Sequence, residues 1–178
     1  SLTQAQIDLI AAGVPGGMRN IQDIYPLAPL QEGILFHHLL QGEGEGEGDA
    51  YVLPALLRFD DRARLDRFVA ALQQVIARHD ILRTAVQWEG LDTPVQVVWR
   101  SASLMLQEQH FDPADGDVQA QLQAHANART VRLDLRRAPM LQAHAAFDPA
   151  SRCWLLQLLH HHLTLGHTTT ELILHQVV

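Results

Sequence analysis

The sequence contains no lysine, because all 13 of its basic residues are arginine. Chemistry that needs a lysine amine, such as a Schiff base or a lysine nucleophile, is therefore excluded. A single cysteine, Cys153, excludes a disulfide framework within the chain and a cysteine-rich zinc site. Since Cys153 stands in the apolar stretch CWLLQLL, we expect it to be a small buried hydrophobic side chain.

Long hydrophobic runs are also absent. No apolar stretch is long enough to span a membrane, and the N-terminus does not resemble a signal peptide, so we expect a cytoplasmic protein without a membrane partner. The formal net charge of −7 disfavours a nucleic-acid partner, because nucleic-acid-binding proteins usually present a basic face. The 178 residues, 47% of them hydrophobic, suffice for one domain or one lobe of a larger domain.

The apolar periodicity predicts an irregular alternation of helices and strands. Helices are expected over 3–12, 29–40, 62–78, 117–135 and 167–178, and strands over 50–60, 81–88, 94–100, 104–111, 140–148 and 153–161. The clearest helix is 62–78, whose apolar stripe is made by Leu65, Phe68, Val69, Leu72, Val75 and Ile76. Hairpins mixed with longer crossovers predict an α/β or α+β fold in which helices flank a mixed β-sheet.

Local signals place some of the element ends. Thr3 with Gln6, and Thr168 with Glu171, have the spacing of a helix capping box. Pro54 within a predicted strand indicates an edge strand or a bulge, since proline cannot donate to a sheet.

The predicted helix 29–40 leads into an unusual acidic loop. Pro29 suits the first turn of a helix, and Leu30, Ile34 and Leu35 should share its inner face. Residues 41–49, QGEGEGEGD, alternate glycine with glutamate, which cannot pack and repel one another. We expect this segment to be a mobile loop.

Three consecutive histidines, 160–162, close the last predicted strand, and His167 follows five residues later. Because side chains alternate along a strand, His160 and His162 should share one face and His161 the other. Gly166 marks a turn into a helix, and such strand ends often carry ligand-binding or catalytic groups. A histidine there can exchange a proton near neutral pH, since its ordinary pKa is about 6.5.

Two other interpretations of the histidine cluster stay open at this point. The side chains could be packed and hydrogen-bonded in the core. Alternatively, His160, His162 and His167 could converge on a metal ion. No carboxylate stands nearby to orient such ligands, so we expect no metal.

Three ordered stretches resemble the opening motifs of condensation domains of nonribosomal peptide synthetases. They are YPLAPLQEGILFH at 25–37, RHDILRTAV at 78–86 and HHLTLGH at 161–167, the last corresponding to the family's HHxxxDG or HHxxxDH. In addition, HHLLQGEGEGEGD, from His37 and His38 to Asp49, resembles the extra histidine motif of dual epimerisation/condensation domains, with a longer spacer than usual. The resemblance covers the whole chain.

The resemblance implies a particular architecture and reaction. The family has two lobes, each like chloramphenicol acetyltransferase, with the active site in a tunnel between them. Residues 1–22 would be an N-terminal helix and linker, and 23–178 the N-terminal lobe, without the C-terminal lobe. An upstream donor and a downstream acceptor carrier protein would deliver substrates on 4'-phosphopantetheine, with no cofactor bound by this chain, and a peptide bond would form.

The resemblance also assigns roles to residues, in one of two registers. In the preferred register, which HTT at 167–169 favours, the paired histidines are His161 and His162, and Gly166 takes the aspartate position. His162 then carries the family's catalytic role, with His161, His37 and His38 as further catalytic candidates. The other register starts at His160 and places Leu165 at the aspartate.

The motif aspartate is absent in both registers. In the family it pairs with an arginine and holds the histidine loop; Arg83, or less favourably Arg78, is the candidate partner here. With Gly166, that arginine would lose its counter-charge, and breaking a buried pair typically costs about 3–5 kcal/mol. We therefore expect an impaired site, or a different acid that supplies the charge.

His162 can act in more than one way. A free α-amine has a pKa of about 7.7–8.0, so a strong base is not compulsory for its attack on a thioester. His162 could orient the amine or stabilise the tetrahedral intermediate, whereas epimerisation requires a positioned base. A non-catalytic scaffold of the same fold, and a free-standing acyltransferase that uses a carrier or coenzyme A donor, are the alternative functions.

Overall fold

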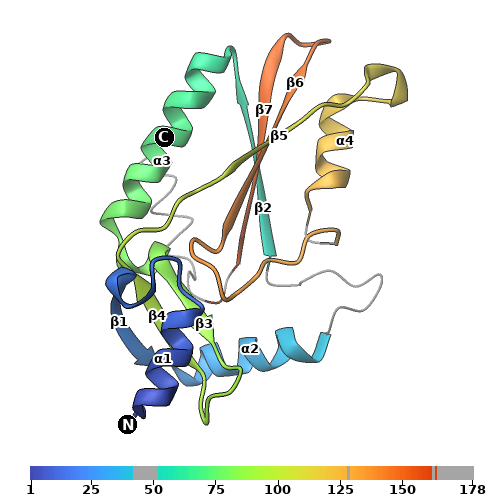
Figure 1. The fold of residues 1–178 in the computed structure, drawn as a ribbon. Coiled ribbons are helices and arrows are strands. Elements are labelled where there is room, and N and C mark those ends of the chain that lie inside the picture. The colour runs from blue at the N-terminus through green and yellow to red at the C-terminus, as the bar shows by residue number, and fades with distance from the viewer. Residues whose placement is uncertain (42–51, 128, 162, 164–178) are drawn as a thin grey trace.

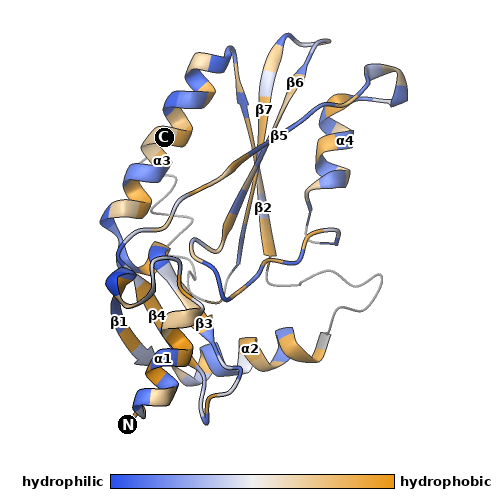
Figure 2. Ribbon diagram, viewed as in Figure 1, coloured by the Kyte–Doolittle hydropathy of each residue, from blue (hydrophilic) through white to orange (hydrophobic). Residues whose placement is uncertain are grey.

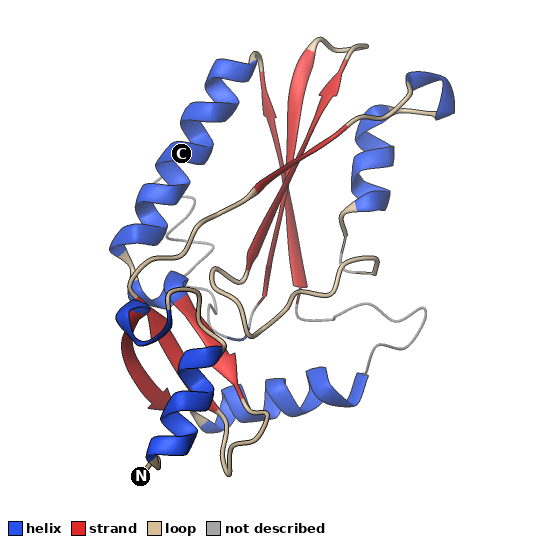
Figure 3. Ribbon diagram, viewed as in Figure 1, coloured by secondary structure: helices blue, strands red, loops and turns tan. Residues whose placement is uncertain are grey.

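The computed structural model describes residues 1–41, 52–127, 129–161 and 163. Within them there are four α-helices and seven strands, and the strands form two separate sheets (Figures 1 and 3). The helices are α1 (Gln4–Ala12), α2 (Pro29–Gln41), α3 (Arg62–Arg78) and α4 (Val118–His125). The strands are β1 (Ile21–Pro26), β2 (Val52–Phe59), β3 (Thr84–Gln87), β4 (Val95–Trp99), β5 (Leu106–Gln109), β6 (Leu141–Asp148) and β7 (Cys153–His161).

The larger sheet has the strand order β2-β7-β6-β5 and is mixed, because β5 and β6 are parallel while the other pairs are antiparallel. Helix α3 covers one of its faces and α4 the other (Figure 1). The alternation along β7 shows this directly: Leu156 and Leu158 join the core cluster with α3, whereas Leu155 joins Val118 and Leu122 of α4. This is the predicted mixed sheet flanked by helices.

The smaller sheet has the order β1-β4-β3. Strand β1 was not predicted. Its sequence, IQDIYP, lacks the apolar–polar alternation that identifies a strand, and only Ile21 of its six residues is buried. The antiparallel pairing with β4 defines this strand instead.

Helix α3 follows from its amphipathic pattern. Asp61 caps its first turn by accepting a hydrogen bond from the backbone N–H of Arg64 at 2.8 Å. Its predicted stripe is buried except for Val69, which is half-buried, and Figure 2 shows polar and apolar residues mixed along it. The predicted capping box of Thr3 and Gln6 is confirmed at the start of α1. Ile10 of α1 and Val14 join the same core cluster as α3.

Three sequence predictions need correction. Leu30 does not lie on the inner face of α2 but is 76% exposed, whereas Ile34 and Leu35 are buried as predicted. The helix predicted over 117–135 ends at His125, because the Asn127 side chain donates to the last-turn carbonyls of Gln123 and Ala124 and stops it.

The third correction concerns the strand predicted over 104–111, which is confined to β5. Pro54 lies in the edge strand β2, as predicted. The loop predicted over 41–49 and the helix predicted over 167–178 fall outside the described residues, apart from Gln41, which closes α2.

Candidate functional site at the end of β7

The histidine cluster begins where β7 ends. In the register of the sheet, His161 pairs with Val52 and His160 with Leu53, both in β2. The main-chain N–H of His161 donates to the carbonyl of Met140, just before β6, at 3.1 Å. Hydrogen bonds from neighbouring strands therefore fix the backbone at the last described position before His162.

The His161 side chain is completely buried. Its Nδ1 accepts a hydrogen bond from the main-chain N–H of Leu163 at 3.0 Å, so the neutral ring carries its proton on Nε2. This bond links the His161 imidazole to the main chain of Leu163, two residues further on.

Helix α2 brings a second predicted histidine to the same place. The His38 ring is 4% exposed and packs edge-on against the His161 ring, with centroids 5.5 Å apart and planes at 81°. Arg132 donates to the carbonyl of His38 at 2.8 Å and fixes that end of α2. His37 is exposed instead, and His160 is buried on the α3 face of β7. Among the described candidates, the structure unites His38 and His161.

A cavity of about 490 Å³ lies beside His38. Trp88 and Leu135 form apolar parts of its wall, and an ion-pair network forms another part. Arg136 contacts Glu89 at 2.9 Å and Asp134 at 3.0 Å. Burial acts to raise the pKa of Asp134, but hydrogen bonds from the Arg136 side chain and backbone lower it overall, so this residue is a carboxylate at neutral pH.

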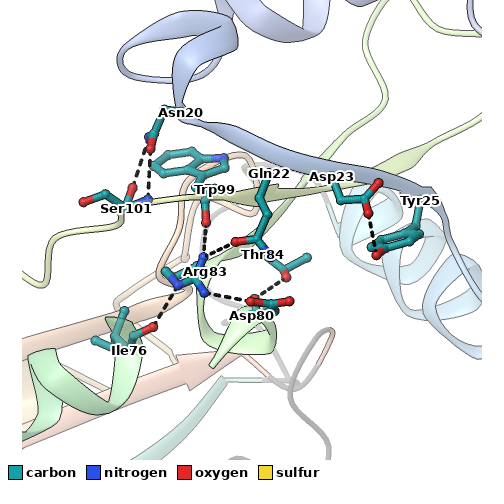
Figure 4. A network of polar contacts seen from close by, with 10 residues as sticks. All are labelled: Asn20, Gln22, Asp23, Tyr25, Ile76, Asp80, Arg83, Thr84, Trp99 and Ser101. Carbon is teal, nitrogen blue, oxygen red and sulfur yellow. Dashed lines mark hydrogen bonds and ion pairs between the residues drawn. The ribbon is translucent and has the colours of Figure 1, made fainter. Parts of the chain in front are cut away.

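Arg83 has a counter-charge in the structure, and a different acid supplies it, which is one of the two outcomes expected from Gly166. The guanidinium contacts Asp80, three residues earlier in the same motif, at 2.7 Å (Figure 4). It also donates to the main-chain carbonyls of Ile76 and Trp99 and to the Gln22 side chain. Since Arg83 is 5% exposed, this network holds the end of α3 to strands β1 and β4.

Arg78, the other candidate partner, is exposed at the C-terminal end of α3. Asp80 and Gln22 were not identified from the sequence as members of this network. Asp80 could have been found, because it stands within RHDILRT next to the arginine it serves. Gln22 carried no signal, since it lies in the unpredicted strand β1.

His162, Gly166 and His167 lie outside the described residues, and so does the metal alternative that needs them. Among the described residues, no three His, Cys, Asp or Glu side chains could together hold a metal ion. Nor does any helix in the described ranges have the length and apolar character that crossing a membrane requires.

Cys153 is a free, buried thiol, as predicted. Its surroundings are more polar than the sequence suggested. The Sγ atom lies 3.2 Å from an Arg58 guanidinium nitrogen and 2.8 Å from the Ser151 hydroxyl, which itself donates to Asp148 at 2.6 Å. These contacts tie β2 to the turn between β6 and β7.

A second pair of histidines, which was not predicted from the sequence, joins the last residue of α4 to β6. The rings of His125 and His144 are 5.8 Å apart, and His144 Nε2 lies 2.9 Å from the Gln142 side-chain oxygen. The Nδ1 of His144 and the side-chain oxygen of Gln157, its cross-strand neighbour, are both buried and have no hydrogen-bond partner among the described residues. Burial, and secondarily the charge of His125, lowers the pKa of His144.

The lowered pKa of His144 predicts acid sensitivity of the fold. The native state binds a proton at this site less readily than the unfolded chain, so its stabilising contribution is complete above the ordinary histidine pKa of about 6.5 and is lost as the pH falls. A His144→Gln variant should therefore show a shallower decrease in the free energy of unfolding between about pH 7.5 and pH 5 in urea titrations, with one proton contributing at most about 1.4 kcal/mol per pH unit. His110→Gln, which removes an exposed imidazole outside the pair, is the matched control and should retain the wild-type slope. Equal slopes in all three proteins would contradict the assignment.

Comparison with known proteins now identifies the class. A family model of the condensation domain matches residues 21–168, and the chain belongs to that family. Malpinin synthetase and malpibaldin synthetase of Mortierella alpina are each 49% identical to it over 172 residues. Tyrocidine synthase 3 of Brevibacillus parabrevis is 28% identical over 162 residues. These matches cover 89% to 97% of the chain, but the chain spans only 2% to 3% of the relatives' own lengths.

Solved structures share the fold. The starter condensation domain of rhizomide synthetase RzmA superposes with a TM-score of 0.69 at 22% identity, over 88% of this chain and 38% of that chain. The four-domain nonribosomal peptide synthetase AB3403, bound to AMP and glycine, gives a TM-score of 0.64 at 13% identity, over 85% of this chain and 12% of that one. These likenesses confirm the predicted mixed α/β class with sheets flanked by helices.

Proposed function

We propose that residues 23–178 form the N-terminal lobe of a nonribosomal peptide synthetase condensation domain that joins two carrier-bound aminoacyl or peptidyl thioesters. The observation that carries this proposal is the contact between His38 and His161. It assembles two motifs from distant parts of the chain directly before position 162. A chloramphenicol-acetyltransferase-like second lobe would complete the site, and the complex would work in the cytoplasm.

The reaction in this proposal is aminolysis of a thioester. The acceptor amine attacks the donor carbonyl carbon, the new C–N bond forms, and the C–S bond of the tetrahedral intermediate breaks. The proton that the amine loses goes to the departing thiolate of the donor phosphopantetheine. His162 orients the amine for this attack, and Gly166 stands where the family has a carboxylate.

The surroundings of His161 support the register in which it is the first motif histidine. Its ring is completely buried and accepts the Leu163 N–H, so it shapes the turn. In the alternative register, His161 would itself be the second histidine, which must reach the substrate. We therefore retain His162 as the catalytic residue, with His161 as a positioning residue.

Epimerisation of the donor residue before condensation is the finer part of the proposal. It needs a base that removes the proton from the donor α-carbon. His38 is the stronger of the two candidates on α2, because it touches His161 and lines the cavity of about 490 Å³, whereas His37 is exposed. The spacer between His38 and Asp49 is longer than usual, and in this respect the chain departs from the subtype's pattern.

The test is peptide-bond formation by the intact polypeptide that contains this chain, with two loaded carrier proteins. We expect a dipeptidyl product, and an L-configured donor should give a D-configured residue in it if epimerisation precedes condensation. His38→Asn should then yield the product with unchanged configuration, whereas a chirality that is insensitive to His38 would remove epimerisation from the proposal.

The main alternative, a non-catalytic scaffold, rests on Gly166. The same assay with a Gly166→Asp variant distinguishes the two functions. If condensation occurs in the wild type or is restored by the aspartate, the chain belongs to an enzyme. If neither protein forms product while both fold, the scaffold function is the correct one.

A further inference from the structure

Arg132 lies in the segment that leads from α4 to β6 and reaches across to the end of α2. Its Nη2 atom donates to the main-chain carbonyl of His38 at 2.8 Å, although the two residues are 94 positions apart. That carbonyl is one of the last four of α2 (Pro29–Gln41), which in an α-helix have no N–H partner within the helix. A cation at this end is also favoured by the helix dipole. Arg132 therefore caps α2 from outside the helix.

The residues beside Arg132 hold its backbone in place. Leu133 is 3% exposed and Leu135 is 1% exposed, and the two pack into different core clusters. The carbonyl of Leu135 also accepts a hydrogen bond from the main-chain N–H of Val86, in β3, at 2.8 Å. Because well-packed interiors resist displacement, the half-buried Arg132 side chain reaches α2 from a fixed support.

The acids in the wall of the cavity of about 490 Å³ are paired with a different arginine. Glu89 and Asp134 both line this cavity, and both contact Arg136, at 2.9 Å and 3.0 Å. Arg132 lines the same cavity but forms no ion pair with a carboxylate in the part of the chain that the structure describes. Its charge is thus directed to the main-chain carbonyl of His38.

The cap acts on the turn that carries His38. The His38 ring is 4% exposed and packs edge-on against the ring of His161, with centroids 5.5 Å apart. Helix ends fray, and a side chain follows the backbone of its own turn. A movement of the last turn of α2 would therefore carry the imidazole away from His161. Displacing a reacting group by about 1 Å can cost about 10²-fold in rate.

We propose that Arg132 is a positioning residue for epimerisation, because its cap holds the His38 imidazole in the orientation from which it removes the α-proton of the donor residue. This role rests on the proposed function, and on its epimerising part. In the step itself the Cα–H bond breaks, the proton goes to the His38 ring, and the electron pair stays on the donor as a thioester enolate. A proton from water then adds on the opposite face, and the imidazolium releases its proton to water. Arg132 contacts none of the reacting atoms.

The first test measures proton abstraction separately from condensation, in the intact polypeptide with loaded carrier proteins. Deuterium uptake from heavy water at the α-carbon of an L-configured donor reports abstraction. Condensation from a D-configured donor needs no abstraction, so a general loss of folding would lower both rates and leave their ratio unchanged. We expect Arg132→Gln to lower the ratio of uptake to condensation by about 10²-fold. Arg129→Gln removes the same charge from an exposed position in the same segment and should keep the wild-type ratio.

A conservative replacement distinguishes the cap from a loss of packing. The contact of Arg132 with His38 is a single hydrogen bond, so a lysine ammonium can make it where it could not replace a two-point contact. Arg132→Lys should therefore recover much of the ratio that Arg132→Gln loses.

The reactivity of His38 towards diethyl pyrocarbonate, mapped by mass spectrometry, reports the geometry without any turnover. The exposed His37 beside it is the internal reference. We expect the modification of His38 relative to His37 to rise severalfold in Arg132→Gln and to return towards the wild-type value in Arg132→Lys. If either the modification or the rate ratio of Arg132→Gln matches the wild type, or if lysine recovers neither, the positioning role is overturned. Failure of the epimerising function would look different, since the wild type would take up no deuterium while the modification of His38 still depended on Arg132.

Discussion

Replacing Arg83 by methionine is expected to lower the free energy of unfolding by about 3–5 kcal/mol. Methionine keeps much of the aliphatic volume but removes every donor. The main-chain carbonyls of Ile76 and Trp99 would lose a charged hydrogen-bond partner in a site that is 5% exposed. Hydrogen bonds to charged groups contribute about 1.5–3 kcal/mol each, and two are lost together. Urea denaturation monitored by tryptophan fluorescence measures the difference.

Two matched variants separate the contributions to this network. Asp80→Asn removes only the ion pair, and because the Asp80 side chain is 60% exposed, we expect a loss of at most about 1 kcal/mol. Arg78→Gln changes an exposed arginine of the same motif and should stay within about 0.5 kcal/mol. If Asp80→Asn were as damaging as Arg83→Met, the ion pair rather than the carbonyl contacts would hold α3 to the sheet.

The Arg83 network changes the meaning of Gly166. From the sequence, loss of the motif aspartate implied either an unpaired buried cation or a different acid that supplies the charge. The structure satisfies that cation within RHDILRT itself, through Asp80. The destabilisation expected from an orphaned guanidinium is therefore not incurred at Arg83.

The sequence predicted best those elements whose own pattern determines them. Helix α3 has a complete amphipathic stripe, β7 is a nearly continuous apolar run before its two final histidines, and β6 is mainly apolar, so their types and approximate bounds could be inferred. Strand β1 could not, because its identity depends on pairing with β4, some 70 residues away. Likewise, the exposure of Leu30 depends on how α2 sits against the sheets, which periodicity alone does not determine.

The candidate site, too, could be predicted from the sequence only in part. Motif order located the histidines, but only the packing of α2 against the end of β7 could show that His38, and not His37, meets His161. The pair His125 and His144 had no sequence signal at all. Their proximity arises because α4 packs across β6, a long-range contact that leaves no local pattern.

Replacing His162 by alanine should reduce the rate of peptide-bond formation by about 10²-fold or more, because a misplacement of the reacting groups by about 1 Å can cost that much. The measurement is product formation from two loaded carrier proteins under single-turnover conditions. His110→Ala, which removes a histidine in the loop after β5, is the control and should keep the wild-type rate. A normal rate in His162→Ala would remove this residue from the mechanism.

A His162→Gln variant then separates the two roles that His162 could have. Glutamine can hydrogen-bond to the acceptor amine but cannot take up a proton near neutral pH. If His162 mainly orients the amine, the glutamine variant should retain much of the rate, and its pH profile should follow only the acceptor amine, whose ordinary pKa is about 7.7–8.0. If His162 acts as a base, His162→Gln should be as slow as His162→Ala at every pH. We expect the first result, because a useful fraction of the amine is already neutral and its placement relative to the thioester carbonyl is the larger barrier.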